Sequence, residues 1–417
     1  MLKQSTWKVP LDVSRKVHQI LFDIEERGDD AVIEWTCKLD QRQISNPDAL
    51  KVDAELMAES LQTLDSEVKG ALELAYQRIK AYHFAERAER NSWRTQDSLG
   101  VIQGRIIRSV RSAGCYIPGG TASYPSSVLM NLAPASVAGV PNTIICSPWP
   151  QGKYSASVLA AAQIADCHNI YSIGGAVAIG AMAFGTESIP AVDIVTGPGN
   201  IWVAEAKRQV FGRVGIDLLA GPSEILIIAD ETARPDWVAA DLCSQAEHDP
   251  SARPILISTS AELTAAVQNR LKEFIPDLER KETICASLTD QGAAITVNNL
   301  EAAAEIANQL APEHLQLAIQ KPQELLPSIQ YAGAVFLGHA SAEVFGDYTA
   351  GSNHILPTGG TARFSQSLSV STFLTEMAFI ECPPPASRKL SRPTEILARE
   401  EQLTAHALAA RLRLDET

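Results

Sequence analysis

The stretch TIICSPWPQGKYSASVLAAAQIADCHNIYSIGGAVAIGAMAFGTESIPAVDIV, residues 143–195, decides the fold class of this chain. Short apolar segments typical of strands alternate in it with helix patterns of about ten residues. The strand-like segments are residues 143–147, 170–173 and 192–195, and the helix patterns are residues 157–165 and 176–184, with a further helix from Ile201. Strands that alternate with helices form βαβ units and a parallel sheet. We therefore expect an α/β fold.

The same alternation restarts after Ala220-Gly-Pro-Ser223. Its strand-like segments are residues 224–230, 254–258, 294–297, 315–319 and 334–337. Two such runs predict two Rossmann-like α/β domains with parallel-rich sheets, joined near this Gly-Pro turn.

Helical segments flank the two runs. Residues 15–92 place apolar side chains at helical spacing, with a break at Gly28-Asp29. Near the C-terminus, the proline-rich residues 382–387 predict a stiff linker. Residues 393–414 are rich in Ala, Leu, Arg and Glu and predict a helix. Such a tail beyond a proline linker could reach a partner subunit.

Composition limits the class of protein. The chain has 417 residues, of which 46% are hydrophobic, and this length predicts roughly two to three domains. The formal net charge of −14 makes nucleic acid and anionic membranes poor partners, because both require basic patches. The sequence has no apolar run long enough to span a bilayer and no apolar signal core. We expect a cytoplasmic protein.

The cysteines argue against a disulfide framework and against a thiolate zinc site. There are seven of them, an odd number, scattered without a CxxC pair. Any bound metal must therefore be held by His, Asp, Glu or Gln.

A polar patch at the end of an apolar helix pattern, Asp241-Leu-Cys-Ser-Gln-Ala-Glu-His-Asp249, offers such ligands. Gln245 and His248 are three residues apart, so on a helix they share one face and could hold one ion. Four histidines have carboxylate, amide or glycine neighbours: His248, His314, His354 and His406. The other four are expected in solvated positions: His18, His83, His168 and His339. Nitrogen and oxygen ligands suit zinc with an open position, or a related divalent ion.

Glu313-His314 combines a carboxylate and an imidazole, the pair needed to activate water and move protons. Adjacent residues on a strand point in opposite directions, so both serve one pocket only at a turn, which Pro312 favours. An ordinary ion pair at the end of an element is the alternative. Gly197-Pro-Gly-Asn200 lies between a strand and a helix, where backbone amides can bind phosphate. Trp202 occupies the place of the third fingerprint glycine, so a simple tight turn remains open.

Taken together, these motifs resemble those of histidinol dehydrogenase. The resemblance extends from about residue 15 to the C-terminus, in one order. The segments that carry it are Tyr116-Ile-Pro-Gly-Gly120, Gly197-Pro-Gly-Asn200, Gly221-Pro-Ser-Glu224, Ser244-Gln-Ala-Glu-His-Asp249, Pro312-Glu-His314, Gly346-Asp-Tyr348, Ser352-Asn-His-Ile-Leu-Pro357 and Leu403-Thr-Ala-His406.

The resemblance implies an intertwined homodimer of two α/β domains with small helical terminal segments. Residues 15–115 with 225–368 would form the first domain, with most zinc and catalytic residues, and residues 116–224 the second, with the NAD contacts. Residues 1–14 would form an N-terminal segment, and residues 369–417 a helical tail that reaches the partner subunit.

The resemblance also implies a role for each site residue. Glu313 and His314 would be the catalytic acid/base pair. One zinc ion per subunit would be bound by Gln245, His248 and Asp347 of one subunit and His406 of the other. All of these except Glu313, together with Ser223, His354 and Glu401, would hold the substrate. Tyr116 and Asn200 would contact NAD.

The implied reaction is the oxidation of L-histidinol to L-histidine through L-histidinal with two NAD, in histidine biosynthesis. One departure is Val177, where the family usually has Gln after Gly-Gly-Ala. Valine offers no hydrogen bond to NAD, which would weaken binding by on the order of 1 kcal/mol for each lost bond or mark another binding mode. Two alternatives are a zinc/NAD dehydrogenase of another small alcohol, such as a sulfonated diol, and a non-catalytic binding protein on the same scaffold. The retained Glu313, His314, His354 and Glu401 argue against both.

Overall fold

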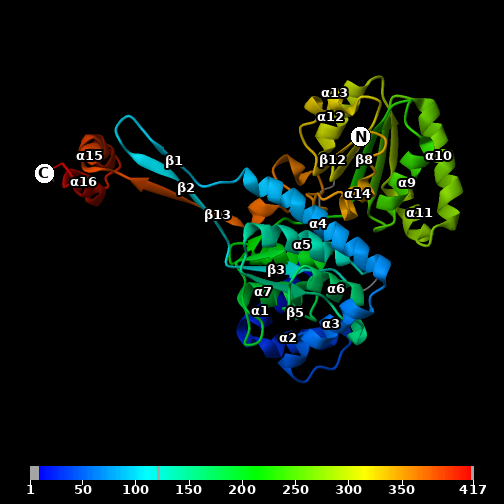
Figure 1. The fold of residues 1–417 in the computed structure, drawn as a ribbon, viewed down its shortest axis with the longest axis horizontal. Coiled ribbons are helices and arrows are strands. Elements are labelled where there is room, and N and C mark those ends of the chain that lie inside the picture. Colours follow the sequence, from blue (N-terminus) through cyan, green and yellow to red (C-terminus); the bar gives the residue numbers. More distant parts are fainter. Residues whose placement is uncertain (1–8, 120–122, 415–417) are drawn as a thin grey trace. The chain divides into compact units, whose positions relative to one another are not determined.

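The computed structural model describes residues 9–119 and 123–414 (Figure 1). By internal contacts the chain divides into two compact units, Met1–Phe84 with Val110–Phe373 and Ala85–Ser109 with Leu374–Thr417. The first unit contains two separate parallel sheets, as the two runs of alternation predict. Gly120 of the predicted Tyr116–Gly120 segment and most of the predicted N-terminal segment lie outside the described residues.

The first sheet has five parallel strands in the order β5-β4-β3-β6-β7. They are β3 (Ser112–Tyr116), β4 (Asn142–Cys146), β5 (Ile170–Tyr171), β6 (Ile194–Thr196) and β7 (Gly215–Ile216). The helices between them are α5 (Pro125–Ala138), α6 (Ala156–Ile164), α7 (Gly175–Phe184) and α8 (Ile201–Val210). Each strand and helix predicted in residues 143–201 is present, with ends shifted by one or two residues.

Successive residues of each strand point to opposite faces of this sheet, and helices cover both faces. Gly114 faces α7 so closely that a Cβ there would lie 2.5 Å from Met182 Sδ. Thr196, on the other face, donates a hydrogen bond of 2.7 Å to Asn131 of α5. The faces are therefore covered by different helices, which explains why the strands are apolar throughout.

Four helices precede this sheet in the chain, and the first three pack against its helices α6, α7 and α8. They are α1 (Leu11–Arg27), α2 (Asp29–Asp40), α3 (Ala54–Thr63) and α4 (Ser66–Ala88). The apolar stripe of α1 packs against α7 and α8, and Gly180 allows this close approach because a Cβ there would lie 2.9 Å from Ile24 Cδ1. The predicted break is confirmed, since Gly28 has φ +55° between α1 and α2. The predicted domain division, which groups residues 15–115 with residues 225–368, stays a prediction.

The second sheet is also parallel, in the order β10-β9-β8-β11-β12. Its strands are β8 (Glu224–Ala229), β9 (Arg253–Ser258), β10 (Ala293–Thr296), β11 (His314–Ala318) and β12 (Ala334–Leu337), and its helices are α9 (Pro235–Ala246), α10 (Ala261–Phe274), α11 (Lys281–Asp290), α12 (Leu300–Leu310), α13 (Pro322–Leu325) and α14 (Glu343–Tyr348). In β8, Ile225 and Ile227 pack with α9 and α10, whereas Leu226 and Ile228 pack with α12. Both faces are therefore buried.

The second unit contains an antiparallel sheet in the order β1-β2-β13 and two helices that pack together. The elements are β1 (Trp93–Gln96), β2 (Ile102–Ser109), β13 (Leu374–Glu381), α15 (Pro384–Glu400) and α16 (Thr404–Arg411). The predicted linker at residues 382–387 is wrong beyond Pro383, because α15 begins at Pro384. A proline in the first turn needs no hydrogen-bond partner for its nitrogen and presets the helical φ.

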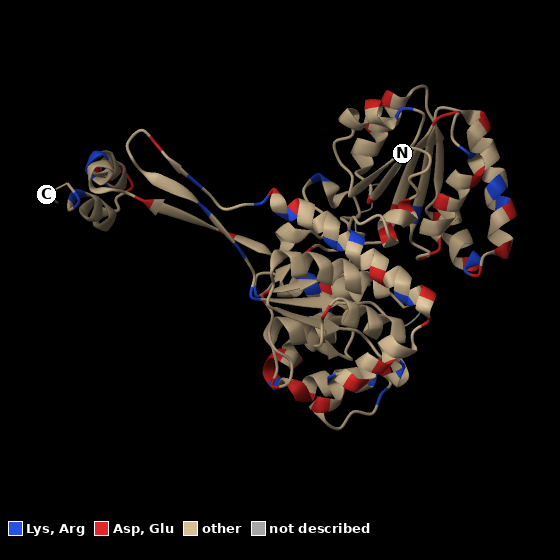
Figure 2. Ribbon diagram, in the orientation of Figure 1, with Lys and Arg blue, Asp and Glu red and all other residues tan. Residues whose placement is uncertain are grey.

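Short 3-10 helices complete the chain: η1 (Pro47–Leu50), η2 (Pro150–Gly152), η3 (Ile275–Asp277), η4 (Leu326–Ser328), η5 (Thr361–Arg363) and η6 (Val370–Phe373). Acidic and basic residues are interspersed along the helices (Figure 2). Among the described residues, no helix combines the length and apolar character needed to cross a membrane.

Candidate active site

The densest group of buried ionisable side chains lies where β8 and β11 begin. Ala311 adopts a left-handed conformation with φ 47° at the end of α12, and Pro312 leads from there into the strand. Glu313 and His314 then both turn toward the backbone of Glu224. The Glu224 N–H donates to Glu313 Oε2 at 2.8 Å, and the Glu224 carbonyl lies 3.0 Å from His314 Nδ1. The predicted turn therefore places the two side chains in one pocket, with His314 Nδ1 3.6 Å from Glu313 Oε2.

The contact with a carbonyl fixes the tautomer of His314. A carbonyl only accepts, so Nδ1 carries the proton and Nε2 of the neutral ring is left as an acceptor. Nε2 is buried without a hydrogen-bond partner, 3.6 Å from Glu343 Oε1 and 3.7 Å from Asp347 Oδ1. In its neutral form the ring can accept a proton from a substrate hydroxyl at Nε2.

Burial and charge shift every pKa in this cluster. Burial raises the pKa of Glu313 to about 8 and the pKa of Glu343 to about 8. Burial alone would lower the pKa of His314, but the carboxylates of Glu313, Glu343 and Asp347 outweigh it and raise the pKa to about 10. Burial opposes ionisation of Asp347, yet the neighbouring charge of His314 holds the pKa of that carboxyl well below its usual range. Without a metal, the cluster therefore retains protons that a cation would displace.

A buried ion pair supports Glu224 from behind. Arg253, the first residue of β9, places Nη1 2.9 Å from Glu224 Oε1, and both side chains are largely buried. The N–H of Gly359 donates to Glu224 Oε2 at 3.2 Å. These contacts hold the peptide to which Glu313 and His314 are bound.

Several donors suitable for a divalent cation converge here. Nitrogen and carboxylate oxygens of His314, Glu343 and Asp347 lie within 4.8 Å of one another. Glu343 and Asp347 are four residues apart on α14 and share one face. Sequence reasoning missed Glu343, although this spacing was visible. Gln245 of α9 is 1% exposed, and its Oε1 has no hydrogen-bond partner. Unpartnered buried oxygens of this kind fit a cation site.

His248 lies just beyond the last residue of α9, and its N–H bonds the Gln245 carbonyl at 3.3 Å. Its side chain is exposed, yet desolvation by the neighbouring protein atoms lowers its pKa, while the charge of Asp347 opposes that shift. A lowered pKa favours the neutral ring, which is the form that binds metal.

His354 borders the same cluster. Its Nδ1 donates to the Asp347 carbonyl at 3.0 Å, so its Nε2, 3.2 Å from Ser127 Oγ, accepts a hydrogen bond from that hydroxyl. Burial lowers the pKa of His354. Ser127 belongs to α5, so residues near the carboxyl edge of the first sheet meet those at the amino edge of the second. Ser223 directly precedes Glu224, and its carbonyl accepts the Arg253 N–H at 2.9 Å.

The Gly197–Asn200 turn lies after β6, at the switch point between β3 and β6. Gly197 has φ +110°, and a Cβ there would lie 2.0 Å from the Tyr116 carbonyl oxygen. The buried pair Lys207–Asp217 holds this glycine from both sides. Lys207 Nζ donates to the Gly197 carbonyl at 2.9 Å, and the Gly197 N–H donates to Asp217 Oδ2 at 2.8 Å.

Of the two residues predicted to contact NAD, Asn200 ends this turn and Tyr116 lies beside Gly197. Asn200 caps α8, accepting hydrogen bonds from the N–H groups of Trp202 and Val203. Tyr116 is 4% exposed, and its hydroxyl accepts the Gly175 N–H at 3.3 Å. Val177 is 1% exposed in the core of the first sheet.

The remaining predicted site residues, Glu401 and His406, belong to the second unit. Both side chains are exposed, Glu401 at the end of α15 and His406 on α16. Among the histidines expected to be solvated, the prediction is wrong for His83, which is fully buried in α4 and lies 3.5 Å from Asn353 Nδ2. Four positions of α4 with helical spacing are buried, so its sequence pattern marked His83 as inward-facing.

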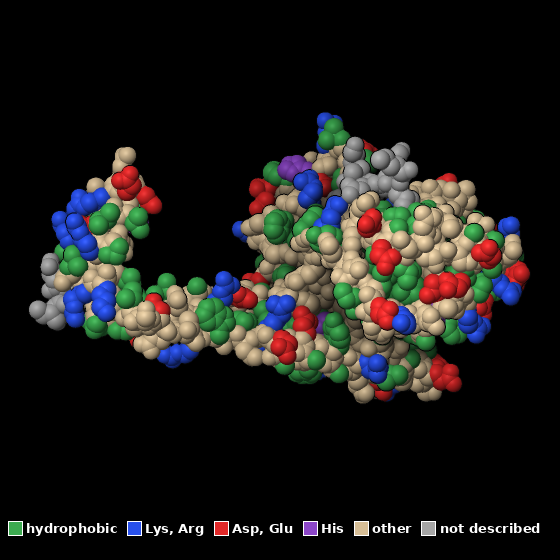
Figure 3. All heavy atoms as spheres, turned by 90° about the horizontal axis from the view of Figure 1, so that it is seen from above, with side chains coloured by type: hydrophobic (Ala, Val, Ile, Leu, Met, Phe, Trp, Pro, Cys, Tyr) green, Lys and Arg blue, Asp and Glu red, His purple; other side chains and the backbone are tan. Residues whose placement is uncertain are grey.

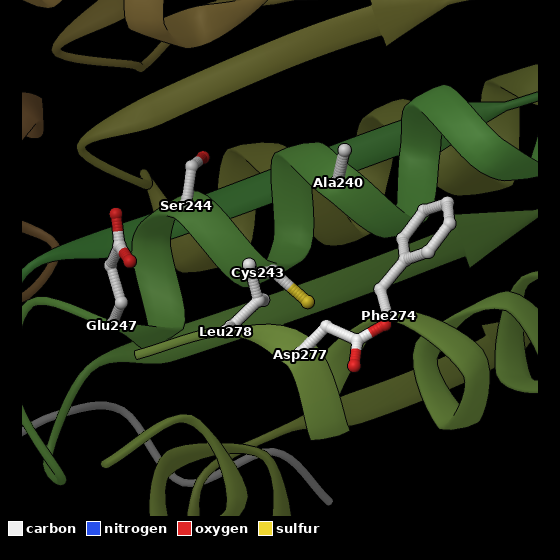
Figure 4. Close-up of a pocket in the computed structure, with 7 residues that line it drawn as sticks. All are labelled: Ala240, Cys243, Ser244, Glu247, Phe274, Asp277 and Leu278. Carbon is white, nitrogen blue, oxygen red and sulfur yellow. The ribbon is translucent and has the colours of Figure 1, made fainter. Parts of the chain in front are cut away.

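A separate cavity of about 400 Å³ adjoins another face of α9 (Figure 4). Its lining contains none of the predicted site residues: Ala240, Cys243, Ser244, Glu247, Phe274, Asp277 and Leu278. Ser244 nevertheless contacts the cluster, with Oγ 3.3 Å from Glu343 Oε2.

The fold contains two Rossmann-like sheets. One carries a glycine turn of the type that binds phosphate, and the other carries a buried acid/base pair with side chains that can bind a metal. These features define a metal-dependent enzyme that uses a dinucleotide cofactor. A family model described as histidinol dehydrogenase matches residues 3–414. The histidinol dehydrogenase of Pseudomonas fluorescens is 46% identical over 402 residues, 96% of this chain and 90% of that protein. That of Methylococcus capsulatus is 46% identical over 403 residues, 97% of this chain and 92% of that protein.

A solved structure agrees with these relatives. The crystal structure of histidinol dehydrogenase from Elizabethkingia anophelis matches with a TM-score of 0.93 and 35% identity, over 99% of this chain and 94% of that chain. The chain belongs to the histidinol dehydrogenase family.

Proposed function

We propose that this chain oxidises L-histidinol through L-histidinal to L-histidine, using zinc and two NAD, in histidine biosynthesis. The observation that supports this most is the pairing of Glu313 and His314 on one peptide, with His314 Nε2 left as a buried acceptor among carboxylates. Membership of the family supplies the substrate and the cofactors.

The residues present fit a zinc ion. Gln245, His248 and Asp347 provide an amide oxygen, an imidazole and a carboxylate, a ligand set that zinc accepts. Glu343 lies close enough to assist. When bound, zinc supplies a positive charge that anchors the imidazole and amino nitrogens of the substrate and so orients it.

The acid/base pair would divide the proton transfers. His314 would accept the proton of the substrate hydroxyl at Nε2 while a hydride leaves the carbinol carbon for NAD. Glu313 would take a proton from a water molecule while the oxygen of that water adds to the aldehyde carbon. Loss of a second hydride and of two protons from the neutral hydrate gives the carboxylate. The burial of both side chains excludes bulk water from the reactive aldehyde.

Around this pair, Ser223, His354 and Glu401 would bind the substrate with the zinc ligands, and Tyr116 and Asn200 would bind NAD. Val177 is buried in the core, so the NAD contact that glutamine makes in the family has no counterpart there. All seven cysteines are free, as expected in a reducing compartment, and we place the protein in the cytoplasm.

We further propose a homodimer in which His406 completes the zinc site of the partner subunit. The second unit is small and exposes apolar side chains (Figure 3), which a partner subunit would cover. Its exposed apolar side chains include Met377, Ile380, Ile396, Leu397, Leu408 and Leu412. His406 is exposed on the same helix as Leu408, so it would enter such an interface.

Heterodimers test the shared site. His406→Ala and Gln245→Ala each remove one proposed ligand, so either homodimer should lose bound zinc and activity. In a mixed dimer one site loses both ligands and the other retains all four. We expect about half of the native activity per fully mixed dimer and one zinc ion per dimer. Verified heterodimers without recovered activity would exclude ligands contributed across the dimer.

The reaction itself is tested by stoichiometry. Purified protein loaded with zinc is supplied with limiting histidinol and excess NAD, and NADH is counted for each histidinol consumed. Two NADH support the proposed four-electron oxidation. One NADH would indicate a simple alcohol dehydrogenase, and none would indicate a binding protein.

A further inference from the structure

The helix α5 contains a proline in its interior, Pro134. Proline has no N–H, so the carbonyl four residues earlier, that of Met130, loses the hydrogen bond that it would otherwise accept within the helix. Asn353 Nδ2 donates to this carbonyl at 2.7 Å, and the Asn353 side chain is 5% exposed. The proline therefore turns the backbone of α5 into an anchor for the segment that contains His354.

A second contact between α5 and this segment lies one helical turn before Met130. Ser127 Oγ is 3.2 Å from His354 Nε2, and the Nδ1 of the same ring donates to the Asp347 carbonyl at 3.0 Å. A carbonyl only accepts, so Nδ1 carries the proton and the serine hydroxyl donates to Nε2. The imidazole of His354 is therefore held at both nitrogens, in one tautomer and one orientation.

The serine is itself fixed to the first sheet. Asn131 Nδ2 donates to the Ser127 carbonyl at 2.7 Å, and Asn131 Oδ1 accepts from Thr196 Oγ1 of β6 at 2.7 Å. Ser127 is 2% exposed, and Asn131 and Thr196 are fully buried. A buried chain of polar groups in which each has a partner is rigid. This chain extends from the middle of the first sheet to His354, which borders the catalytic cluster of the second.

We propose that Ser127 and Pro134 are positioning residues for substrate binding, which act through His354. Ser127 fixes the ring of His354, and Pro134 frees the carbonyl that holds Asn353. The inference rests on the proposed function, in which His354 binds the substrate. Neither residue is among the predicted site residues, and the burial of Ser127 keeps its hydroxyl away from the substrate itself.

Nitrogen NMR of the zinc-loaded protein, labelled with ¹⁵N in histidine, tests the contact without turnover. The resonance of His354 is assigned by its loss in His354→Gln. Ser127→Ala removes the donor to Nε2, so the Nε2 resonance should move downfield, while Nδ1 keeps its proton because the carbonyl still accepts it. Ser287→Ala is the matched control. It removes another buried serine hydroxyl, which donates to the Ala252 carbonyl at 2.9 Å, and should leave His354 unchanged.

Calorimetry with histidinol, in the absence of NAD, gives the second measurement. Ser127→Ala should weaken binding about fivefold, as the loss of one buried hydrogen bond does. Pro134→Ala restores a helix N–H that competes with Asn353, so it should also weaken binding, about two- to threefold. Alanine is the better helix former, so Tm should not fall in this variant. Weaker binding without lower stability separates positioning from general destabilisation, and Ser287→Ala should leave the affinity unchanged.

Three results would overturn the proposal. The first is native affinity for histidinol in a Ser127→Ala enzyme that still oxidises it. The second is weaker binding with an unmoved His354 resonance, because the effect would then not pass through that ring. The third is native affinity in folded Pro134→Ala. A resonance that moves in a protein unable to bind or oxidise histidinol would instead support the positioning of the ring and reject the proposed function.

Discussion

The two parallel sheets of this protein share one strand order but place their chemistry at opposite edges. Both sheets run third, second, first, fourth and fifth strand in chain order. In the first sheet, the carboxyl ends of the strands lead into glycine turns and into a cavity with one lysine. In the second, the amino ends carry Glu224, Arg253 and His314.

Polar side chains also lie at the carboxyl edge of the second sheet. There, Asp230 accepts hydrogen bonds from Gln320 and Thr232, and Thr232 contacts His339. These polar groups bind mainly one another. Identical topology therefore supports a cofactor-type edge, a catalytic edge and a structural edge, and only the side chains distinguish them.

The strongest predicted loss of activity comes from a substitution at the amino edge of the second sheet, compared with one at its carboxyl edge. His314→Gln should lower kcat by roughly 10²–10⁴-fold, because general acid–base catalysis contributes about that much. Asp230→Asn, on the carboxyl edge of the same sheet, should keep kcat within about threefold, since its partners are structural. Initial rates of NADH formation measure both. Equal losses in two folded variants would show that the catalytic edge is misassigned.

At the catalytic edge, Glu313→Gln should slow the second oxidation more than the first. Histidinol to histidinal needs no added water, whereas the second step requires a hydrated aldehyde. We expect the second half-reaction, measured with histidinal supplied directly, to fall at least about tenfold more than the first. Glu343→Gln, a neighbouring carboxylate without a proposed role in hydration, is the matched control. Equal losses in both half-reactions would reject the division of labour.

On the cofactor edge, Lys207 and Asp217 hold Gly197 and thereby the turn that leads to Asn200. Removing both charges together, as Lys207→Met with Asp217→Leu, avoids an unpaired buried ion. KM for NAD should rise about tenfold, the equivalent of one or two lost hydrogen bonds, while kcat stays within twofold. Arg208→Ala changes the next residue without touching the turn. A folded double variant with native KM for NAD would show that the turn needs no such support.

The smallest expected change is in the free energy of unfolding and concerns Glu205 of α8, a helix that packs on the first sheet. A hydrogen bond from Arg208 lowers the pKa of Glu205 to about 2, despite its burial, with help from Gln209 and Ser14. A lowered pKa in the folded state gives stability that is present above about pH 4.5 and is lost as pH falls toward 2. Because Arg208 is half exposed, we expect Glu205→Gln to cost about 1–2 kcal/mol at pH 7.

Urea denaturation at several pH values measures this difference. The gap between wild type and Glu205→Gln should stay constant from pH 7 to about 5 and narrow below 4.5. Glu55→Gln removes an exposed carboxylate of α3 and should give no comparable gap. A gap that is independent of pH would show that Glu205 acts by packing rather than by charge.

Sequence reasoning recovered the α/β class, both runs of strands and the proximity of Glu313 and His314, because each depends on local periodicity or on one turn. It could not recover the packing of α1 on the first sheet, since an amphipathic stripe does not identify the surface that it covers. The start of α15 at Pro384 was missed because the prolines were taken for a linker, and β13 was missed because it lies outside both runs of alternation. Glu343 was missed because its role depends on the His314 ring, which is distant in sequence.

The peptide of Glu224 links the two reacting side chains in a further way. Its N–H and its carbonyl bind Glu313 and His314 respectively, and both point toward β11. The backbone of one residue of β8 therefore positions both the acid and the base. A substitution that displaces the backbone of Glu224 should therefore disable both half-reactions at once.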